Sequence, residues 1–274
     1  PRTALAVLAG AALGLAGAVM QGISRNPLAD PGILGVNAGA ALFVVVGIAW
    51  FDISGAQSFL WLGVAGAGVT AIFVYLIGSA GQGGATPLKL TLAGTATSVA
   101  VSAFIIAVVL PRNDIAGSVQ SWQVGGIGGA SFETLLPALP FALVGFALSL
   151  ASARVLNALA LGEELATGLG QSVALGRVMA AAGAVILCGT ATALCGPIGF
   201  VGLVVPHLCR MIAGVDYKLV LPLSALAGAS MLGLSDVLGR VIARPNELDV
   251  GIVTAFVGAP FFIWTVRNHR MRGL

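Results

Sequence analysis

The sequence has 274 residues, of which 58% are hydrophobic and only 8% are charged, and its mean hydropathy is +1.03. Soluble domains carry about a quarter charged residues, so this composition excludes an ordinary soluble protein. The net charge of +3 is small and comes mostly from arginines between apolar runs. It indicates membrane topology rather than nucleic-acid binding.

Several apolar runs approach or exceed the length of about 20 residues that a membrane-spanning helix needs. The sequence therefore predicts an all-α, polytopic membrane protein with one domain over residues 1–274. The candidate spans are residues 3–22, 34–51, 58–78, 87–110, 134–155, 177–195, 198–213, 219–243 and 248–267.

Positive charge predicts the orientation of these nine spans. Arg267, Arg270 and Arg272 place the C-terminus in the cytoplasm, because cytoplasmic loops carry an excess of Lys and Arg. Alternation back along the chain leaves the N-terminus outside and puts these residues inside: Arg25, Lys89, Arg154, Arg177 and Lys218. An odd number of spans with an external start predicts that one more helix precedes this sequence, giving ten natively.

Small residues within the first spans predict tight helix packing. Gly10 and Gly14, and Gly35 and Gly39, have the GxxxG spacing that lets helix backbones approach closely in lipid. The segment "QGISRNPLADPGILGVNAGA" (21–40) joins the first two spans. Its Asn-Pro and Asp-Pro-Gly signals predict a tight cytoplasmic turn.

The stretch "NALALGEELATGLG" (157–170) is too polar to cross a bilayer and contains the adjacent carboxylates Glu163 and Glu164. Leu161, Leu165 and Leu169 recur every four residues, which predicts one apolar helical stripe that packs on a protein surface. We expect Gly168 and Gly170 to end this helix and turn into the next. The alternative is a solvated amphipathic loop.

The stretch "GPIGFVGLVVPH" (196–207) predicts a broken helix. Gly196, Pro197 and Gly199 interrupt the pattern, and Pro206 lies inside the next apolar run. Neighbouring helices can relieve such a kink. The break could equally line a pathway, and its spacing does not separate the two interpretations.

Motifs for covalent chemistry are absent from the sequence. It contains no GxxxxGK[ST], HExxH or nucleophile-elbow motif, so this chain is not an enzyme and cannot hydrolyse ATP by itself. The three cysteines have no metal-ligand spacing, so we expect no metal site. Asp236 and Arg240 are four residues apart in one span, which predicts a structural ion pair near its outer end.

Four motifs, in order along the chain, resemble the FecCD-type permeases, the membrane subunits of type II ABC importers for ferric siderophores, haem and cobalamin. They are "GAVMQGISRNPLADPGILGVNAGAAL", "LNALALGEELATGLG", "GPIGFVGLVVPHLCR" and "ELDVGIVTAFVGAPFFIW". The resemblance covers essentially the whole chain and implies the ten-span permease fold of that family, with the first span missing here.

The resemblance also implies site residues. Two cytoplasmic coupling helices, within about 157–175, would dock on a separate ATPase that carries ATP and Mg; the matching residues are Leu161, Gly162, Glu163, Glu164, Leu165, Ala166, Gly168, Leu169 and Gly170. Arg2 and Arg240 match arginines that meet an extracytoplasmic substrate-binding protein. Thr86 and Pro87 match a cytoplasmic gate, although "ATPLKL" departs from the Ser/Thr-rich form of cobalamin permeases.

We therefore expect a multi-pass subunit of the bacterial cytoplasmic membrane that imports a ferric siderophore and holds no cofactor of its own. Its partners would be the ATPase, the binding protein, a second identical or related permease and the lipid bilayer, but no nucleic acid. Haem and cobalamin are the alternative substrates, and scarce His and Tyr weigh against haem. An ion-coupled secondary transporter would need acids at mid-membrane, and an intramembrane enzyme a catalytic constellation; the sequence displays neither.

Overall fold

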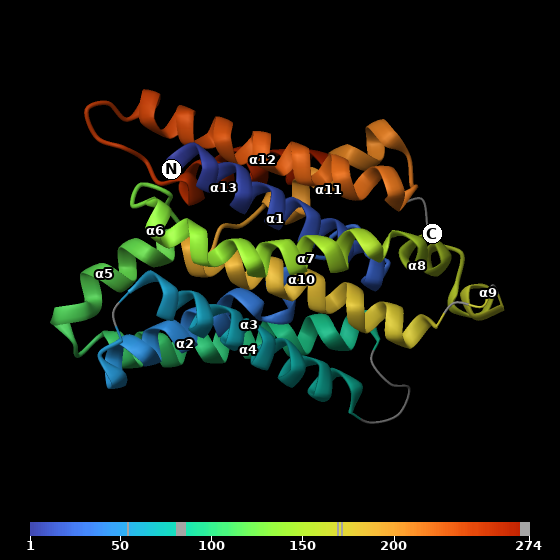
Figure 1. The fold of residues 1–274 in the computed structure, drawn as a ribbon, viewed down its shortest axis with the longest axis horizontal. Coiled ribbons are helices and arrows are strands. Elements are labelled where there is room, and N and C mark those ends of the chain that lie inside the picture. Colours follow the sequence, from blue (N-terminus) through green and yellow to red (C-terminus); the bar gives the residue numbers. More distant parts are fainter. Residues whose placement is uncertain (54, 81–85, 169, 171, 269–274) are drawn as a thin grey trace.

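The computed structural model describes residues 1–53, 55–80, 86–168, 170 and 172–268, and within them it contains helices and no strands. The longer helices run alongside one another as an elongated bundle (Figure 1). The elements are α1 (Arg2–Ser24), η1 (Pro31–Leu34), α2 (Val36–Phe51), α3 (Ala56–Ser79), α4 (Pro87–Val109), α5 (Asn113–Val124), α6 (Phe132–Leu135), η2 (Leu136–Ala138), α7 (Leu139–Ala151), α8 (Ala153–Ala160), α9 (Glu163–Gly168), α10 (Val173–Cys195), α11 (Val201–Ala213), α12 (Tyr217–Ile242) and α13 (Val250–Asn268).

The expected all-α membrane fold is confirmed. In the described residues, six helical segments are long and apolar enough to cross a bilayer: Arg2–Ser24, Gln57–Ser79, Leu88–Val109, Phe132–Ala151, Val173–Cys195 and Tyr217–Ile242. Three shorter apolar helices, Val36–Phe51, Val201–Ala213 and Val250–Ile263, occupy the remaining predicted segments. For those three, a full crossing stays a prediction.

Helix α1 is the most buried of these long helices, and glycines let its neighbours approach it. A Cβ atom on Gly10 would lie 2.3 Å from the carbonyl oxygen of Gly228 in α12, and one on Gly14 would lie 2.2 Å from that of Ser224. Distances this short are possible only because neither position has a side chain. The predicted close packing at Gly10 and Gly14 is confirmed.

The second glycine pair behaves differently. Gly39 packs against α3, where an added Cβ would lie 2.0 Å from the Thr70 hydroxyl oxygen. Gly35 has φ +71° and forms the corner between η1 and α2, so its role is conformational rather than helix packing.

The turns predicted at Asn26-Pro27 and Asp30-Pro31-Gly32 are present, but the segment between the first two spans is more than a tight turn. Residues after Arg25 fold back against the bundle, where Ala29 is buried and η1 packs against α2, α3 and α4. The Asp30 carboxylate caps η1 by accepting a hydrogen bond from the Gly32 N–H at 2.7 Å. The turn signals are local, whereas burial of the apolar residues between them is a tertiary effect.

The short helices and the N-terminus lie at two opposite ends of the bundle (Figure 1). The N-terminus and helices α5 and α6 lie at one end, which we call the Arg2 end. Helices α8 and α9 lie at the opposite end, which we call the α9 end. In the topology that the charge pattern predicts, the α9 end faces the cytoplasm.

Candidate functional site

The predicted coupling segment forms two short helices at the α9 end. The first, α8, starts at Ala153, almost directly after α7, rather than near residue 157. The two helices are separated at Gly162, whose φ of +117° favours glycine. Gly168 is the last residue of α9, and Gly170 follows with φ +75°. The predicted end of the Glu163 helix at Gly168 and Gly170 is thus confirmed, whereas the break between the two short helices lies at Gly162. Leu169 lies outside the described residues.

One face of α9 is attached to the rest of this chain. The Glu163 carboxylate accepts a hydrogen bond from the Arg177 guanidinium at 2.6 Å, and the Arg25 guanidinium lies 3.8 Å from the same oxygen. Ala166 is completely buried on the same side of the helix. Glu163 therefore ties α9 to α10 and to the end of α1, while its side chain stays 57% exposed. Contact of either adjacent carboxylate with a partner stays a prediction.

The opposite face of α9 is exposed. Successive residues of an α-helix are about 100° apart, so Glu164 and Leu165 point away from the side that carries Glu163 and Ala166. Both are exposed, and Leu165 is 61% accessible. Leu161, equally exposed, belongs to the end of α8, so the predicted stripe comes from two helices rather than one. Glu164 and Leu165 therefore lie on the side of α9 opposite the buried Ala166.

Helix α8 is attached to α12. The Asn157 side chain donates a hydrogen bond to the Asp216 carboxylate at 2.6 Å and accepts one from the Tyr217 N–H at 2.8 Å. Asp216 also caps α12, accepting from the Lys218 N–H at 2.9 Å. The hydrogen bond from Asn157 is the largest cause that lowers the pKa of Asp216 below its ordinary value. The side-chain hydrogen bonds and ion pairs of the two short helices therefore reach different elements, although both helices also pack against α10.

Glu163→Gln is expected to lower the thermal unfolding temperature slightly at neutral pH, because exposed ion pairs contribute at most about 1 kcal/mol. The pKa of Glu163 lies below its ordinary value, because Arg177 donates a hydrogen bond and Arg177 and Arg25 add positive charge. A lowered folded-state pKa gives stabilisation that is present above the unfolded pKa of 4.5 and is lost as the pH falls through the lower folded value.

The measurement is thermal unfolding of the purified wild type and Glu163→Gln between about pH 7 and about pH 3. The difference in unfolding temperature between the wild type and Glu163→Gln should disappear at the acid end of this range. Glu164→Gln, on the exposed face of the same helix, is the control and should match the wild type throughout. If the unfolding temperature of Glu163→Gln stays below that of the wild type by the same amount in acid, the ion pair is not the cause of the difference.

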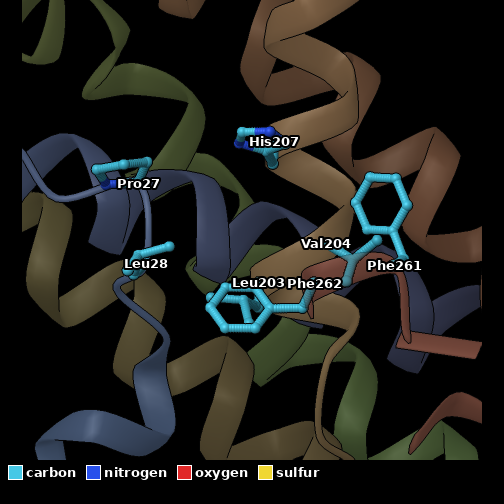
Figure 2. A pocket seen from close by; sticks show the side chains of 7 residues that line it. All are labelled: Pro27, Leu28, Leu203, Val204, His207, Phe261 and Phe262. Carbon is cyan, nitrogen blue, oxygen red and sulfur yellow. The ribbon is translucent and has the colours of Figure 1, made fainter. Parts of the chain in front are cut away.

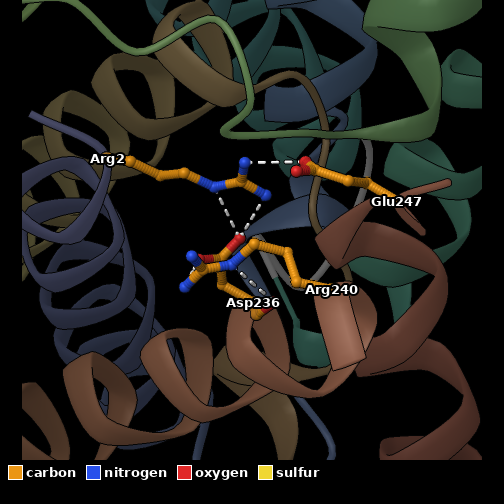
Figure 3. Close-up of polar contacts among 4 residues, drawn as sticks. All are labelled: Arg2, Asp236, Arg240 and Glu247. Atoms are coloured by element: carbon orange, nitrogen blue, oxygen red, sulfur yellow. Dashed lines mark hydrogen bonds and ion pairs between the residues drawn. The ribbon is translucent and has the colours of Figure 1, made fainter. Parts of the chain in front are cut away.

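The two arginines predicted to dock a binding protein lie together at the Arg2 end (Figure 3). The Arg2 guanidinium donates to one oxygen of Asp236 at 2.7 and 2.9 Å, and to Glu247 at 2.7 Å. Arg240 lies 2.9 Å from the other Asp236 oxygen, which confirms the predicted pair within α12. Asp236 and Glu247 were not predicted as partners of Arg2, because they follow it in the sequence by more than 230 residues.

The predicted gate residues begin α4 at the α9 end. Thr86 is the N-cap, and its hydroxyl accepts a hydrogen bond from the Lys89 N–H at 3.3 Å. Pro87 is the first residue of the helix, a position where its missing N–H costs nothing. These features explain how α4 starts, and the gate itself stays a prediction.

The break predicted at 196–199 separates α10 from α11. Gly196 has φ +73°, and a Cβ there would lie 2.0 Å from the Trp122 carbonyl oxygen, so the corner packs tightly against the end of α5. Pro197 and Gly199 continue this non-helical stretch, and Pro206 lies inside α11.

A small apolar pocket lies beside α11 and has room for about one water molecule. Figure 2 shows its lining from α11, α13 and the segment after α1: Pro27, Leu28, Leu203, Val204, His207, Phe261 and Phe262. A ligand pocket usually measures about 300–1,000 Å³. This pocket is therefore no substrate site.

Polar groups inside the bundle serve packing. The Arg210 side chain turns inward and donates to the Gln21 side-chain oxygen. The Gln21 amide in turn donates to the carbonyl oxygens of Gly202 and Leu203, both at 3.2 Å. Among the described residues, no three His, Cys, Asp or Glu side chains are grouped as metal ligands.

Comparisons with known proteins agree with this architecture. The chain is 43% identical to the ferric enterobactin transport system permease of Escherichia coli (strain K12), covering 100% of this chain and 81% of that protein. It is 43% identical to the Fe(3+)-citrate import permease of Bacillus subtilis (strain 168), covering 98% and 80%. The iron(3+)-hydroxamate import permease FhuB of the same bacterium is 40% identical, with coverage of 100% and 71%.

Two solved structures have the same fold. A metal-chelate-type ABC transporter in an inward-facing conformation matches with a TM-score of 0.87 and 31% identity, covering 97% of this chain and 85% of that one. PsaBC from Streptococcus pneumoniae matches with a TM-score of 0.65 over 99% and 93% of the two chains, and at 14% identity it supports the fold alone. Residues 1–268 match the FecCD transport family, and the chain is thus a multi-pass membrane permease that belongs to this family of ABC transporters.

Proposed function

We propose that this permease imports a ferric siderophore across the bacterial cytoplasmic membrane, powered by a separate ATPase that carries ATP and Mg. The outward face of α9 carries this proposal, because Glu164 and Leu165 are exposed while Glu163 and Ala166 attach the helix to the bundle. A helix with one anchored face and one exposed acidic and apolar face suits docking on a protein.

Coupling follows from how the two short helices are attached. ATP binding would move the ATPase subunits, and α8 and α9 would transmit this movement to the long helices that they contact. Asn157 connects α8 to α12, and Glu163 connects α9 to α10 and α1. The permease would thus switch between inward- and outward-facing states as its helices move as rigid bodies. It would form and break no covalent bond.

The path for the substrate is proposed to lie between two permease subunits, identical or related. Helix α4 is mostly exposed, and its exposed surface carries the small or polar residues Thr95 and Ser102 among large apolar side chains, which are Leu88, Leu92, Val99, Phe104 and Ile106. Small and polar residues favour helix contacts or a wet passage over lipid. A hollow of about 400 Å³ also opens at the outer ends of α2 and α4, beside Trp50 and Arg112.

The Arg2 end is proposed to receive a substrate-binding protein. Arg2 and Arg240 are partly exposed there. Exposed charges of this kind mainly set the rate and orientation of encounter with an acidic surface.

Substrate choice is tested by uptake into proteoliposomes that hold the full-length permease and its ATPase. Ferric enterobactin, ferric citrate, a ferric hydroxamate, haem and cobalamin are each delivered by a matching binding protein. We expect ATP-dependent accumulation of one or more ferric chelates and of neither haem nor cobalamin. Accumulation of haem or cobalamin alone would refute the siderophore assignment and leave the importer assignment in place.

A further inference from the structure

The charges at the Arg2 end form a closed network rather than a pair of free arginines. Arg2 and Arg240 share the carboxylate of Asp236, one arginine on each oxygen, and Arg2 also holds Glu247 (Figure 3). Two positive and two negative groups cancel. An arriving acidic surface therefore meets no net positive charge in this network.

The two carboxylates differ sharply in environment. The side chain of Asp236 is only 4% exposed, and it accepts two hydrogen bonds from Arg2 at 2.7 and 2.9 Å. A buried carboxylate between two guanidinium groups holds both of them in position. Without Asp236, the side chains of Arg2 and Arg240 would lose this fixed position.

Glu247 is 53% exposed and lies in the connection between α12 and α13. Its single contact with Arg2, at 2.7 Å, is an exposed ion pair. Exposed ion pairs of this kind contribute little to stability. Another carboxylate can therefore replace Glu247 on Arg2 at little cost.

We propose that Asp236 is a positioning residue that fixes the docking arginines, and that Glu247 occupies the place on Arg2 that a carboxylate of the substrate-binding protein takes on docking. This inference rests on the proposed docking at the Arg2 end and adds its regulation. Exchange of Glu247 for the partner's carboxylate keeps Arg2 paired throughout. Docking is thereby weaker than it would be on an Arg2 without Glu247.

The test measures binding of the siderophore-loaded binding protein to the full-length permease with its ATPase in nanodiscs. Glu247→Gln and Asp236→Asn each remove one negative charge. Net charge alone predicts that both tighten binding. We expect opposite results: Glu247→Gln should bind about two- to fivefold tighter with faster association at low salt, whereas Asp236→Asn should bind about tenfold weaker or worse.

Two further variants isolate the cause. Glu133→Gln removes an exposed acidic charge on α6, near the same end, and should change binding little. Arg2→Gln should weaken binding and cancel the gain from Glu247→Gln, because Glu247 acts through Arg2. Retained ATPase binding at the α9 end reports that each variant is folded.

The outcomes separate this inference from the function on which it rests. Wild-type permease that fails to bind the binding protein overturns the proposed docking and this inference together. Normal wild-type binding that shifts equally in Asp236→Asn, Glu247→Gln and Glu133→Gln overturns this inference alone. If Asp236→Asn does not fold, Glu247→Gln decides, and unchanged or weaker binding counts against the proposal.

Discussion

Leu165→Asp is expected to abolish coupling to the ATPase while leaving the helix bundle folded. Leu165 is exposed on the outer face of α9, away from the contacts that hold this helix to the chain. Burying a leucine at an interface is favourable by about 1.5–3 kcal/mol. Each 1.4 kcal/mol corresponds to a tenfold change in affinity, so the loss should weaken ATPase binding about 10- to 100-fold. A buried, unpaired aspartate would add to this loss.

The measurement is the affinity of the ATPase for the permease in nanodiscs, together with the ATPase rate. Thr167→Asp places the same charge on the side of α9 that carries Glu163, which pairs with this chain's own arginines. Permease with Thr167→Asp should therefore bind the ATPase much more tightly than permease with Leu165→Asp. Leu165→Met keeps an apolar side chain and should bind like the wild type. If Leu165→Asp binds the ATPase as tightly as the wild type does, the outer face of α9 is not the docking surface.

Gly228→Ala adds only one methyl group but is expected to destabilise the bundle strongly. An added Cβ would lie 2.2 Å from the carbonyl oxygen of Gly10, so α1 and α12 would have to move apart. Overpacking of this kind costs about 1–3 kcal/mol. Because the obstacle is backbone, no side chain can rotate away to relieve it.

Gly233→Ala is the matched control for this prediction. It lies in the same helix, and an added Cβ there would meet no atom within 4 Å. Alanine favours helix over glycine by about 1 kcal/mol, so this variant should be neutral or slightly stabilised. Thermal unfolding of both purified variants gives the comparison. Similar unfolding temperatures for both would contradict the close approach of α1 and α12.

The long helices could be predicted because long apolar runs report membrane burial directly. The Gly10 and Gly14 contact could also be predicted, since small-residue spacing is itself the packing signal. The fold of residues 25–35 against the bundle could not. Its proline and glycine signals describe local turns, and burial of Ala29 depends on helices distant in the sequence.

The candidate site was predictable as a segment but not as a surface. Composition singled out residues 157–170, yet only the structure shows that Glu163 pairs with Arg177 and Arg25 while the neighbouring Glu164 lies on the other side of α9. The attachment of α8 through Asn157 likewise depends on Asp216, a residue in another loop. Both are tertiary contacts without a local sequence signal.

The most direct test of the proposed transport function is the energy source for uptake. Proteoliposomes with the full-length permease, its ATPase and the binding protein are supplied with a ferric siderophore, with and without ATP, before and after ionophores collapse the proton and sodium gradients. We predict uptake that requires ATP hydrolysis and is unaffected by the ionophores. Uptake that proceeds without ATP and stops when a gradient is collapsed would contradict an ATP-driven importer and identify an ion-coupled transporter instead.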